Sequence, residues 1–135
     1  MLINRRDLII GVGAFALSTE VQAAPQVRLG IILVGLSWCP YCKNAAALLY
    51  HSTPLLGVPV LIASKDNRPI TPYTEFVSAS QHPIADQIMR VPTTLFYQPD
   101  EERLVDMIEG FRDPRRYLLR VKRVVQTAIK AGYVD

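Results

Sequence analysis

The chain has 135 residues, of which 50% are apolar and 20% are charged, and its formal net charge is +3. This length suits one domain, and the composition is that of a globular protein with enough apolar residues for a core. The net charge is modest and no basic stripe with aromatic residues among it occurs, which argues against a nucleic-acid-binding protein.

The first 23 residues have the pattern of an export signal. Arg5 and Arg6 form a charged start, a ten-residue apolar run follows over residues 8–17, and Ala23 ends a small-residue cleavage site. We expect cleavage there, which leaves residues 24–135 as the folded domain in the periplasm. The paired arginines resemble a twin-arginine signal, and ordinary Sec export stays open. An uncut signal would instead anchor the protein to the inner membrane.

The only two cysteines, Cys39 and Cys42, stand where a predicted strand gives way to a predicted helix. Residues 29–36 are rich in Ile, Leu and Val, as in a buried strand, and residues 42–51 favour a helix that ends before Pro54. The unpaired N–H groups and the dipole of a helix N-terminus favour negative charge on the first thiol, and the thiolate is the nucleophile. Pro40 suits the first helical turn, and Trp38 offers a flat apolar surface to a partner.

Other uses of the cysteine pair are open at this point. Zinc would need two more ligands, which His51 and His82 could supply, although neither lies near the pair in sequence. A purely structural disulfide would close a very short loop and would gain little from it. A redox-active pair is favoured, and in an oxidising compartment its state would depend on its partners.

The rest of the chain predicts alternating strands and helices. We expect a strand over residues 58–63, parallel to the first, then short helical pieces over 74–80 and 84–89. Pro92 opens a strand over 93–97, which forms a hairpin with a strand over 103–108, where Val105 and Met107 share a face. Asp113 caps a last helix, with Pro114 at its first position.

The last helix is predicted to be amphipathic, with an apolar face toward the core and a basic face outward. The residues expected to face the core are Leu118, Val121, Val124, Val125, Ala128 and Ile129. The basic residues are Arg115, Arg116, Arg120, Lys122 and Arg123. A solvated face explains them, and contact with an acidic partner or with anionic lipid stays open.

The order of these elements resembles the thioredoxin superfamily. The motif Trp38-Cys39-Pro40-Tyr41-Cys42 comes early, and Val91-Pro92-Thr93 follows about 50 residues later in the chain, as in that superfamily. The resemblance covers nearly all of residues 24–135. It implies an α/β protein with a minimal thioredoxin-like fold, in which helices flank a central four-stranded mixed sheet.

The resemblance also implies roles for individual residues. Cys39 would be the attacking thiol and Cys42 the resolving thiol, and together they would form a redox-active disulfide. Pro92 matches the cis-proline, and the Val91 backbone would pair with an extended substrate segment. Substrate contacts are further implied for Trp38, Pro40, Tyr41 and Gly110. The buried acid that thioredoxin places six residues before its first cysteine is replaced by Leu33, so no proton acceptor for Cys42 is visible.

Together these features predict an exported protein thiol–disulfide oxidoreductase that needs no cofactor and no metal. We expect it to act as a reductant on protein disulfides, with an inner-membrane thiol donor or acceptor as its redox partner. Membrane contact is expected only if the signal is not cut. One alternative is delivery of a soft metal such as copper by Cys39 and Cys42. Another is a non-catalytic thioredoxin-like subunit of a larger assembly.

Overall fold

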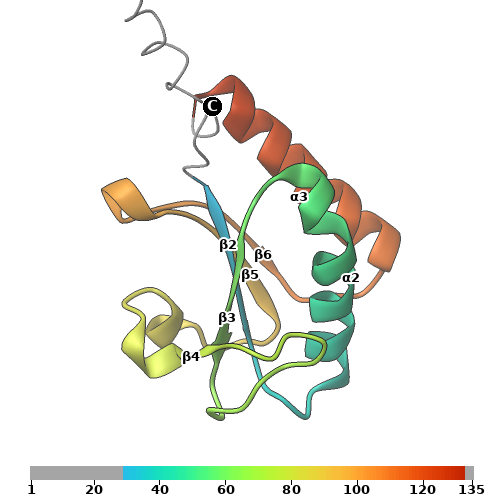
Figure 1. The fold of residues 1–135 in the computed structure, drawn as a ribbon, viewed down its shortest axis with the longest axis vertical. Helices are drawn as coiled ribbons and strands as arrows, with labels where there is room; N and C mark the ends of the chain where they lie inside the picture. The colour runs from blue at the N-terminus through green and yellow to red at the C-terminus, as the bar shows by residue number, and fades with distance from the viewer. Residues whose placement is uncertain (1–28, 133–135) are drawn as a thin grey trace, which may run out of the picture.

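Five strands form one mixed sheet in the computed structural model, which describes residues 29–132 (Figure 1). Their order across the sheet is β4-β3-β2-β5-β6. The strands are β2 (Gly30–Gly35), β3 (Val60–Ser64), β4 (Val77–Ser78), β5 (Thr93–Gln98) and β6 (Arg103–Glu109). The predicted fold class is confirmed, and the sheet has the four predicted strands plus the two-residue edge strand β4. The predicted export signal lies outside the described residues.

Strand β2 is the centre of the sheet because almost every residue in it is apolar and buried. It pairs in parallel with β3, with Ile31 opposite Val60, and antiparallel with β5, with Ile31 opposite Phe96. A strand that is flanked on both sides and covered on both faces reads as a continuous apolar run, as this one does. The cysteine motif follows directly at the C-terminal end of β2.

Helix α2 spans Pro40–Leu56 and is longer than predicted at both ends. The predicted end before Pro54 is wrong, because Pro54 lies in the last turn, where its missing N–H removes only one helical hydrogen bond. The Thr53 hydroxyl donates to the Leu49 carbonyl at 2.7 Å, and the helix ends at Gly57, whose φ of +71° is left-handed. Glycine adopts that conformation without steric cost, which sets the boundary.

The two helical pieces predicted before Pro92 are largely wrong. Residues 77–78 form β4, which pairs in parallel with β3, and only the short 3₁₀ turns η2 (Ala79–Gln81) and η3 (Ala85–Gln87) are helical. The His82 Nδ1 atom accepts the Ile84 and Ala85 N–H groups at 3.2 and 3.3 Å, so this histidine closes the turn between them. Residues 77–78 pair with the free edge of β3, and this pairing with a distant strand cannot be predicted from local helix propensity.

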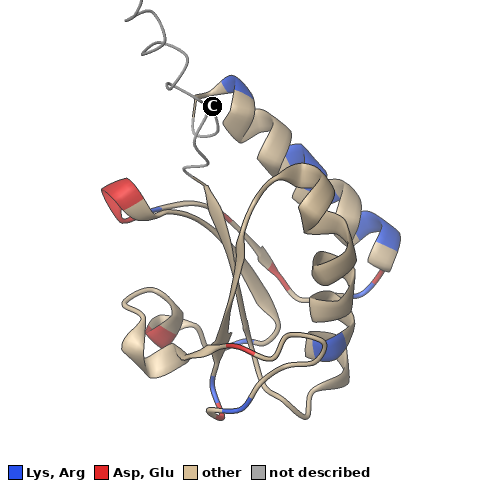
Figure 2. Cartoon of the chain, in the orientation of Figure 1, with Lys and Arg blue, Asp and Glu red and all other residues tan. Residues whose placement is uncertain are grey.

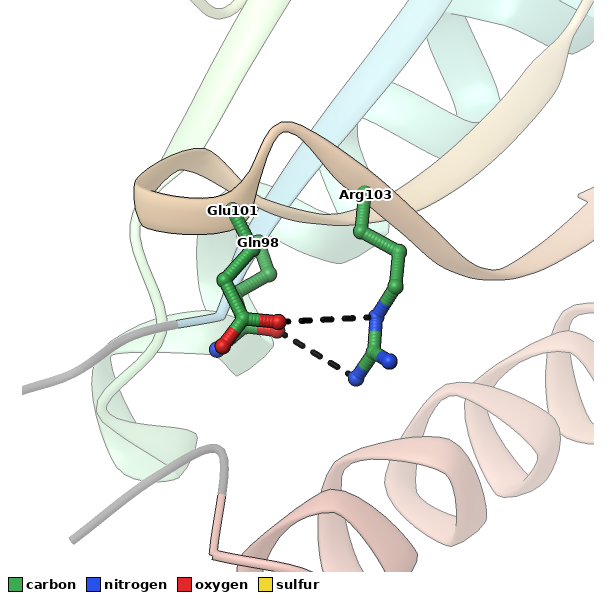
Figure 3. Close-up of polar contacts among 3 residues, drawn as sticks. All are labelled: Gln98, Glu101 and Arg103. Atoms are coloured by element: carbon green, nitrogen blue, oxygen red, sulfur yellow. Dashed lines mark hydrogen bonds and ion pairs between the residues drawn. The ribbon is translucent and has the colours of Figure 1, made fainter.

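Strands β5 and β6 form the predicted hairpin, closed by the 3₁₀ turn η4 (Pro99–Glu101). Beside this turn the Arg103 guanidinium lies 3.4 Å from the Gln98 amide oxygen and 4.0 Å from a Glu101 carboxylate oxygen (Figure 3). The pairing shifts at Phe96 and Tyr97, which leaves Val105 as an extra residue. The prediction that Val105 and Met107 share a face is wrong, because this bulge sends them to opposite sides of the sheet.

Helix α3 spans Pro114–Lys130 and begins as predicted, with the Asp113 carboxylate accepting the Arg115 N–H at 3.1 Å. Helices α2 and α3 cover one face of the sheet, while η2 and η3 lie on the other (Figure 1). Ile129, predicted to face the core, is exposed, and Tyr117 is buried instead. Across residues 29–132, no helix combines the length and apolar character that crossing a bilayer requires.

Candidate active site

Cys39 is the N-cap residue of α2, and Pro40 follows at the start of the helix. The Cys39 sulfur accepts the Cys42 N–H at 3.3 Å, and the Cys39 N–H donates to the Leu36 carbonyl across a tight turn. One of the orphan N–H groups of the helix N-terminus therefore points at the first sulfur. The sulfur thus takes the place that a side-chain oxygen has in other helix N-caps.

The two sulfurs differ in their exposure. Both cysteines are free thiols, and Cys39 is 8% exposed whereas Cys42 is fully buried. Burial first, and then the hydrogen bond with the Cys39 thiol, raises the pKa of Cys42 from 9.0 to about 12. Cys42 therefore keeps its proton at neutral pH, and only Cys39 is positioned to react with another molecule.

Gly35, the last residue of β2, lies directly against the buried thiol. A Cβ atom at this position would stand 3.0 Å from the Cys42 sulfur and 3.0 Å from the Ile70 Cδ1 atom. The space that Cys42 occupies therefore exists because residue 35 lacks a side chain. A glycine at the end of a buried strand, shortly before the cysteines, was the available sequence signal for this contact.

Val91 and Pro92 lie beside the cysteine motif, although they are about 50 residues away in sequence. The Val91–Pro92 peptide bond is cis, and the Pro92 carbonyl accepts the Gly110 N–H at 2.8 Å. A hollow of about 440 Å³ is lined by Tyr41, Val91, Pro92, Gly110, Phe111 and Arg112. Four of the eight residues singled out from the sequence thus surround one hollow, and Phe111 and Arg112 join them.

The other two residues assigned to substrate contact lie outside that hollow. Trp38 is 68% exposed, and Pro40 is also on the surface next to Cys39. The backbone N–H and C=O of Val91 make no hydrogen bond to the part of the chain that the structure describes. Strand addition uses backbone groups that lack a partner in this way.

Asp66 joins the loop after β3 to the loop that carries the cysteines, and sequence reasoning missed it. One carboxylate oxygen accepts the Ser64 hydroxyl at 2.8 Å, and the carboxylate also accepts the backbone N–H and the hydroxyl of Ser37. Partial desolvation raises the pKa of Asp66, but the hydrogen bonds from Ser37 and Ser64 outweigh it and hold that pKa below its ordinary value. Asp66 is thus a charged anchor for Ser37, which stands two residues before Cys39.

A structural zinc site would need more ligands than the cysteine pair offers. Within residues 29–132, no three His, Cys, Asp or Glu side chains come together in a way that could hold a metal ion. His82 is occupied with the backbone of the η2–η3 turn, and His51 stacks edge-on against Tyr50 at 5.4 Å between ring centroids. The two histidines considered as zinc ligands do not gather with the cysteines.

Comparisons with known proteins relate this chain to solved structures alone. No family model matches the sequence, and no curated protein matches it. The periplasmic thioredoxin SoxS of Paracoccus pantotrophus is 17% identical, and the match covers 74% of this chain and 98% of that one at a TM-score of 0.50. The thioredoxin of Plasmodium falciparum is 21% identical over 76% and 83% of the two chains, with a TM-score of 0.51.

A third thioredoxin, from Malassezia sympodialis, is 17% identical over 80% of this chain and 84% of its own, also at a TM-score of 0.51. At such low identity, a shared fold is what these matches establish. The protein has a thioredoxin fold, and the resemblance to the thioredoxin superfamily predicted from its sequence is confirmed at that level.

Proposed function

We propose that the protein is a thiol–disulfide oxidoreductase that exchanges disulfides with protein substrates through Cys39 and Cys42. The observation that carries this proposal is the asymmetry of the pair beside an open hollow. Cys39 caps α2 and is slightly exposed, Cys42 is buried with a raised pKa, and Tyr41 between them lines the same hollow as Val91 and Pro92.

The reaction is a two-step exchange of sulfur–sulfur bonds. The Cys39 thiolate attacks one sulfur of the substrate disulfide, the substrate S–S bond breaks, and the departing substrate thiolate takes up a proton. Cys42 then loses its proton and attacks the Cys39 sulfur, which releases the second substrate thiolate and leaves the Cys39–Cys42 disulfide. Two electrons pass from the pair to the substrate, and a thiol donor restores the two thiols.

The substrate segment is proposed to lie along residues 91–92. The free N–H and C=O of Val91 would pair with the substrate backbone, and Tyr41, Pro92 and Gly110 would surround it. Exposed Trp38 and Pro40 would contact the surface of the substrate protein near its disulfide. An aromatic side chain of this exposure offers a large apolar area to a partner.

We place the protein in the periplasm, with residues 1–23 as its export signal, and favour the reductive direction. The segment between β3 and β5 contains only the two-residue strand β4 and short 3₁₀ turns, which fits a compact reductant better than an oxidant with a large substrate-binding insertion. An inner-membrane thiol donor would restore the dithiol. Cell fractionation with a C-terminal tag, and the reduction potential of the pair in glutathione buffers, test location and direction.

Single cysteine variants test the roles of the two sulfurs. Cys39→Ser is expected to abolish the reduction of insulin driven by dithiothreitol, because the buried thiol cannot reach a substrate. Cys42→Ser is expected to accumulate a mixed disulfide through Cys39, visible on a non-reducing gel and by mass spectrometry. If Cys39→Ser formed the mixed disulfide through Cys42 instead, the proposed roles would be wrong.

A further inference from the structure

A second hollow lies next to the one beside the cysteine motif. Its volume is about 530 Å³, and it shares Gly110, Phe111 and Arg112 with the first. Arg116 and Arg120 of α3 extend it away from the cysteines. The remaining lining residues are Ile108, Glu109, Asp113 and Tyr117. The two hollows therefore adjoin at these three shared residues.

Three arginines line this hollow. Arg116 and Arg120 are four residues apart, so they lie on the same face of α3, and Arg112 stands just before the helix. All three are exposed. None of the three side chains forms an ion pair or hydrogen bond with another residue in the range 29–132.

The acidic residues of the hollow offset only part of the positive charge of these arginines. The Asp113 carboxylate accepts the backbone N–H of Arg115 as the helix cap, and Glu109 is exposed. Three cations and two anions line the hollow, so its net charge is +1. Figure 2 shows Lys and Arg recurring along α3, beside which this hollow lies. The planar guanidinium forks are suited to carboxylates, which they bind with two parallel hydrogen bonds.

We propose that this arginine hollow, defined by Arg112, Arg116 and Arg120, binds an acidic stretch that flanks the disulfide of the protein substrate. This inference rests on the proposed function and names the class of substrate. The hollow is continuous with the surface where the substrate backbone would pair, which favours one extended protein segment over a membrane surface. Charge complementarity would raise the rate of association and select among substrates.

The test uses three disulfide-containing peptides that differ only in the residues flanking the disulfide, which are Glu, Gln or Lys. Second-order rate constants for their reduction are measured with the full domain in 20 mM and 200 mM salt. The Glu peptide is expected to react about three- to tenfold faster than the Gln peptide at low salt, since exposed ion pairs contribute modestly. This preference should shrink at high salt because exposed charges are screened.

Matched double variants separate the site from general charge. Arg116→Gln with Arg120→Gln should remove the preference, while Arg115→Gln with Lys122→Gln should keep it. Both variants lose two positive charges from α3, but Arg115 and Lys122 do not line the hollow. Because all four side chains are exposed, both variants should fold, which thermal unfolding would verify. Equal losses in the two variants would overturn the inference.

Two further measurements keep this inference distinct from the proposed function. Reduction of an uncharged small disulfide reports on the cysteine pair alone and should be unchanged in both double variants. If that reaction failed in the unaltered protein, the proposed function would be wrong, and peptide binding by fluorescence anisotropy would still decide the inference. Equal affinity for Glu and Gln peptides would overturn it. The inference would also be overturned if the protein sedimented with anionic vesicles in a way that depends on Arg116 and Arg120, while showing no preference among the peptides.

Discussion

Replacing Gly35 by alanine should destabilise the protein by crowding the buried thiol. The added Cβ would meet the Cys42 sulfur and the Ile70 Cδ1 atom at 3.0 Å each, closer than ordinary contact. Both neighbours are fully buried, so neither can move freely. Overpacking of this kind costs about 1–3 kcal/mol of the free energy of unfolding. For a domain of this size, that cost corresponds to a fall in Tm of roughly 5–15 °C.

The matched control is Gly30→Ala at the other end of the same strand. Its Cβ would have the Tyr97 carbonyl oxygen 3.9 Å away as its nearest neighbour, which is ordinary contact. This variant should unfold at the same temperature as the unaltered protein or slightly higher, because alanine loses less backbone entropy on folding than glycine.

Thermal unfolding followed by circular dichroism, with the cysteines kept reduced, measures both variants. The rate of Cys42 alkylation after partial denaturation gives a second readout, because a displaced sulfur should become accessible earlier in Gly35→Ala. Equal Tm values for Gly35→Ala and Gly30→Ala would refute the reasoning, since the space beside Cys42 would then not depend on residue 35.

Two further predictions follow from the pKa shifts. Asp66→Asn should lower the free energy of unfolding by about 1 kcal/mol at pH 7, since it weakens charge-assisted hydrogen bonds at a partly exposed site. Because the pKa of Asp66 is lowered, this stabilisation should fade as the pH falls below about 4. A difference in the free energy of urea unfolding between Asp66→Asn and the unaltered protein that stayed constant from pH 7 to pH 3 would contradict this expectation. For Cys42, whose pKa is raised to about 12, the reduced protein should lose stability as the pH rises from about 9 toward 12. Cys42→Ser should lose less over that range, and identical pH profiles would count against a buried neutral thiol.

The cysteine motif and the elements on either side of it were predictable because their signals are local. An apolar run, a cysteine pair and Pro40 predict a strand and a helix N-terminus from neighbouring residues alone. The same holds for Asp113 and Pro114 at the start of α3, where the cap and the first helical position are adjacent in sequence. The hydrogen bond from Asp113 agrees with that prediction.

Predictions failed where a distant partner decides the local conformation. The segment before Pro92 has weak propensity of its own, and pairing with β3 made part of it a strand. The bulge at Val105 depends on how β6 pairs with β5, and the sequence pattern of β6 alone does not show that register. Pro54 was a plausible helix end, but the left-handed Gly57 three residues later is the real one.

By itself, the sequence predicted that two cysteines lie where a strand gives way to a helix, because that arrangement depends on the spacing of a few neighbouring residues. The tertiary structure alone decided what surrounds those sulfurs. Asp66 contacts Ser37, 29 positions away, because the parallel strands β2 and β3 end side by side. Gly110 hydrogen-bonds to Pro92 because the hairpin of β5 and β6 brings the start of one strand next to the end of the other. Such contacts follow from packing and register, which neighbouring residues do not encode.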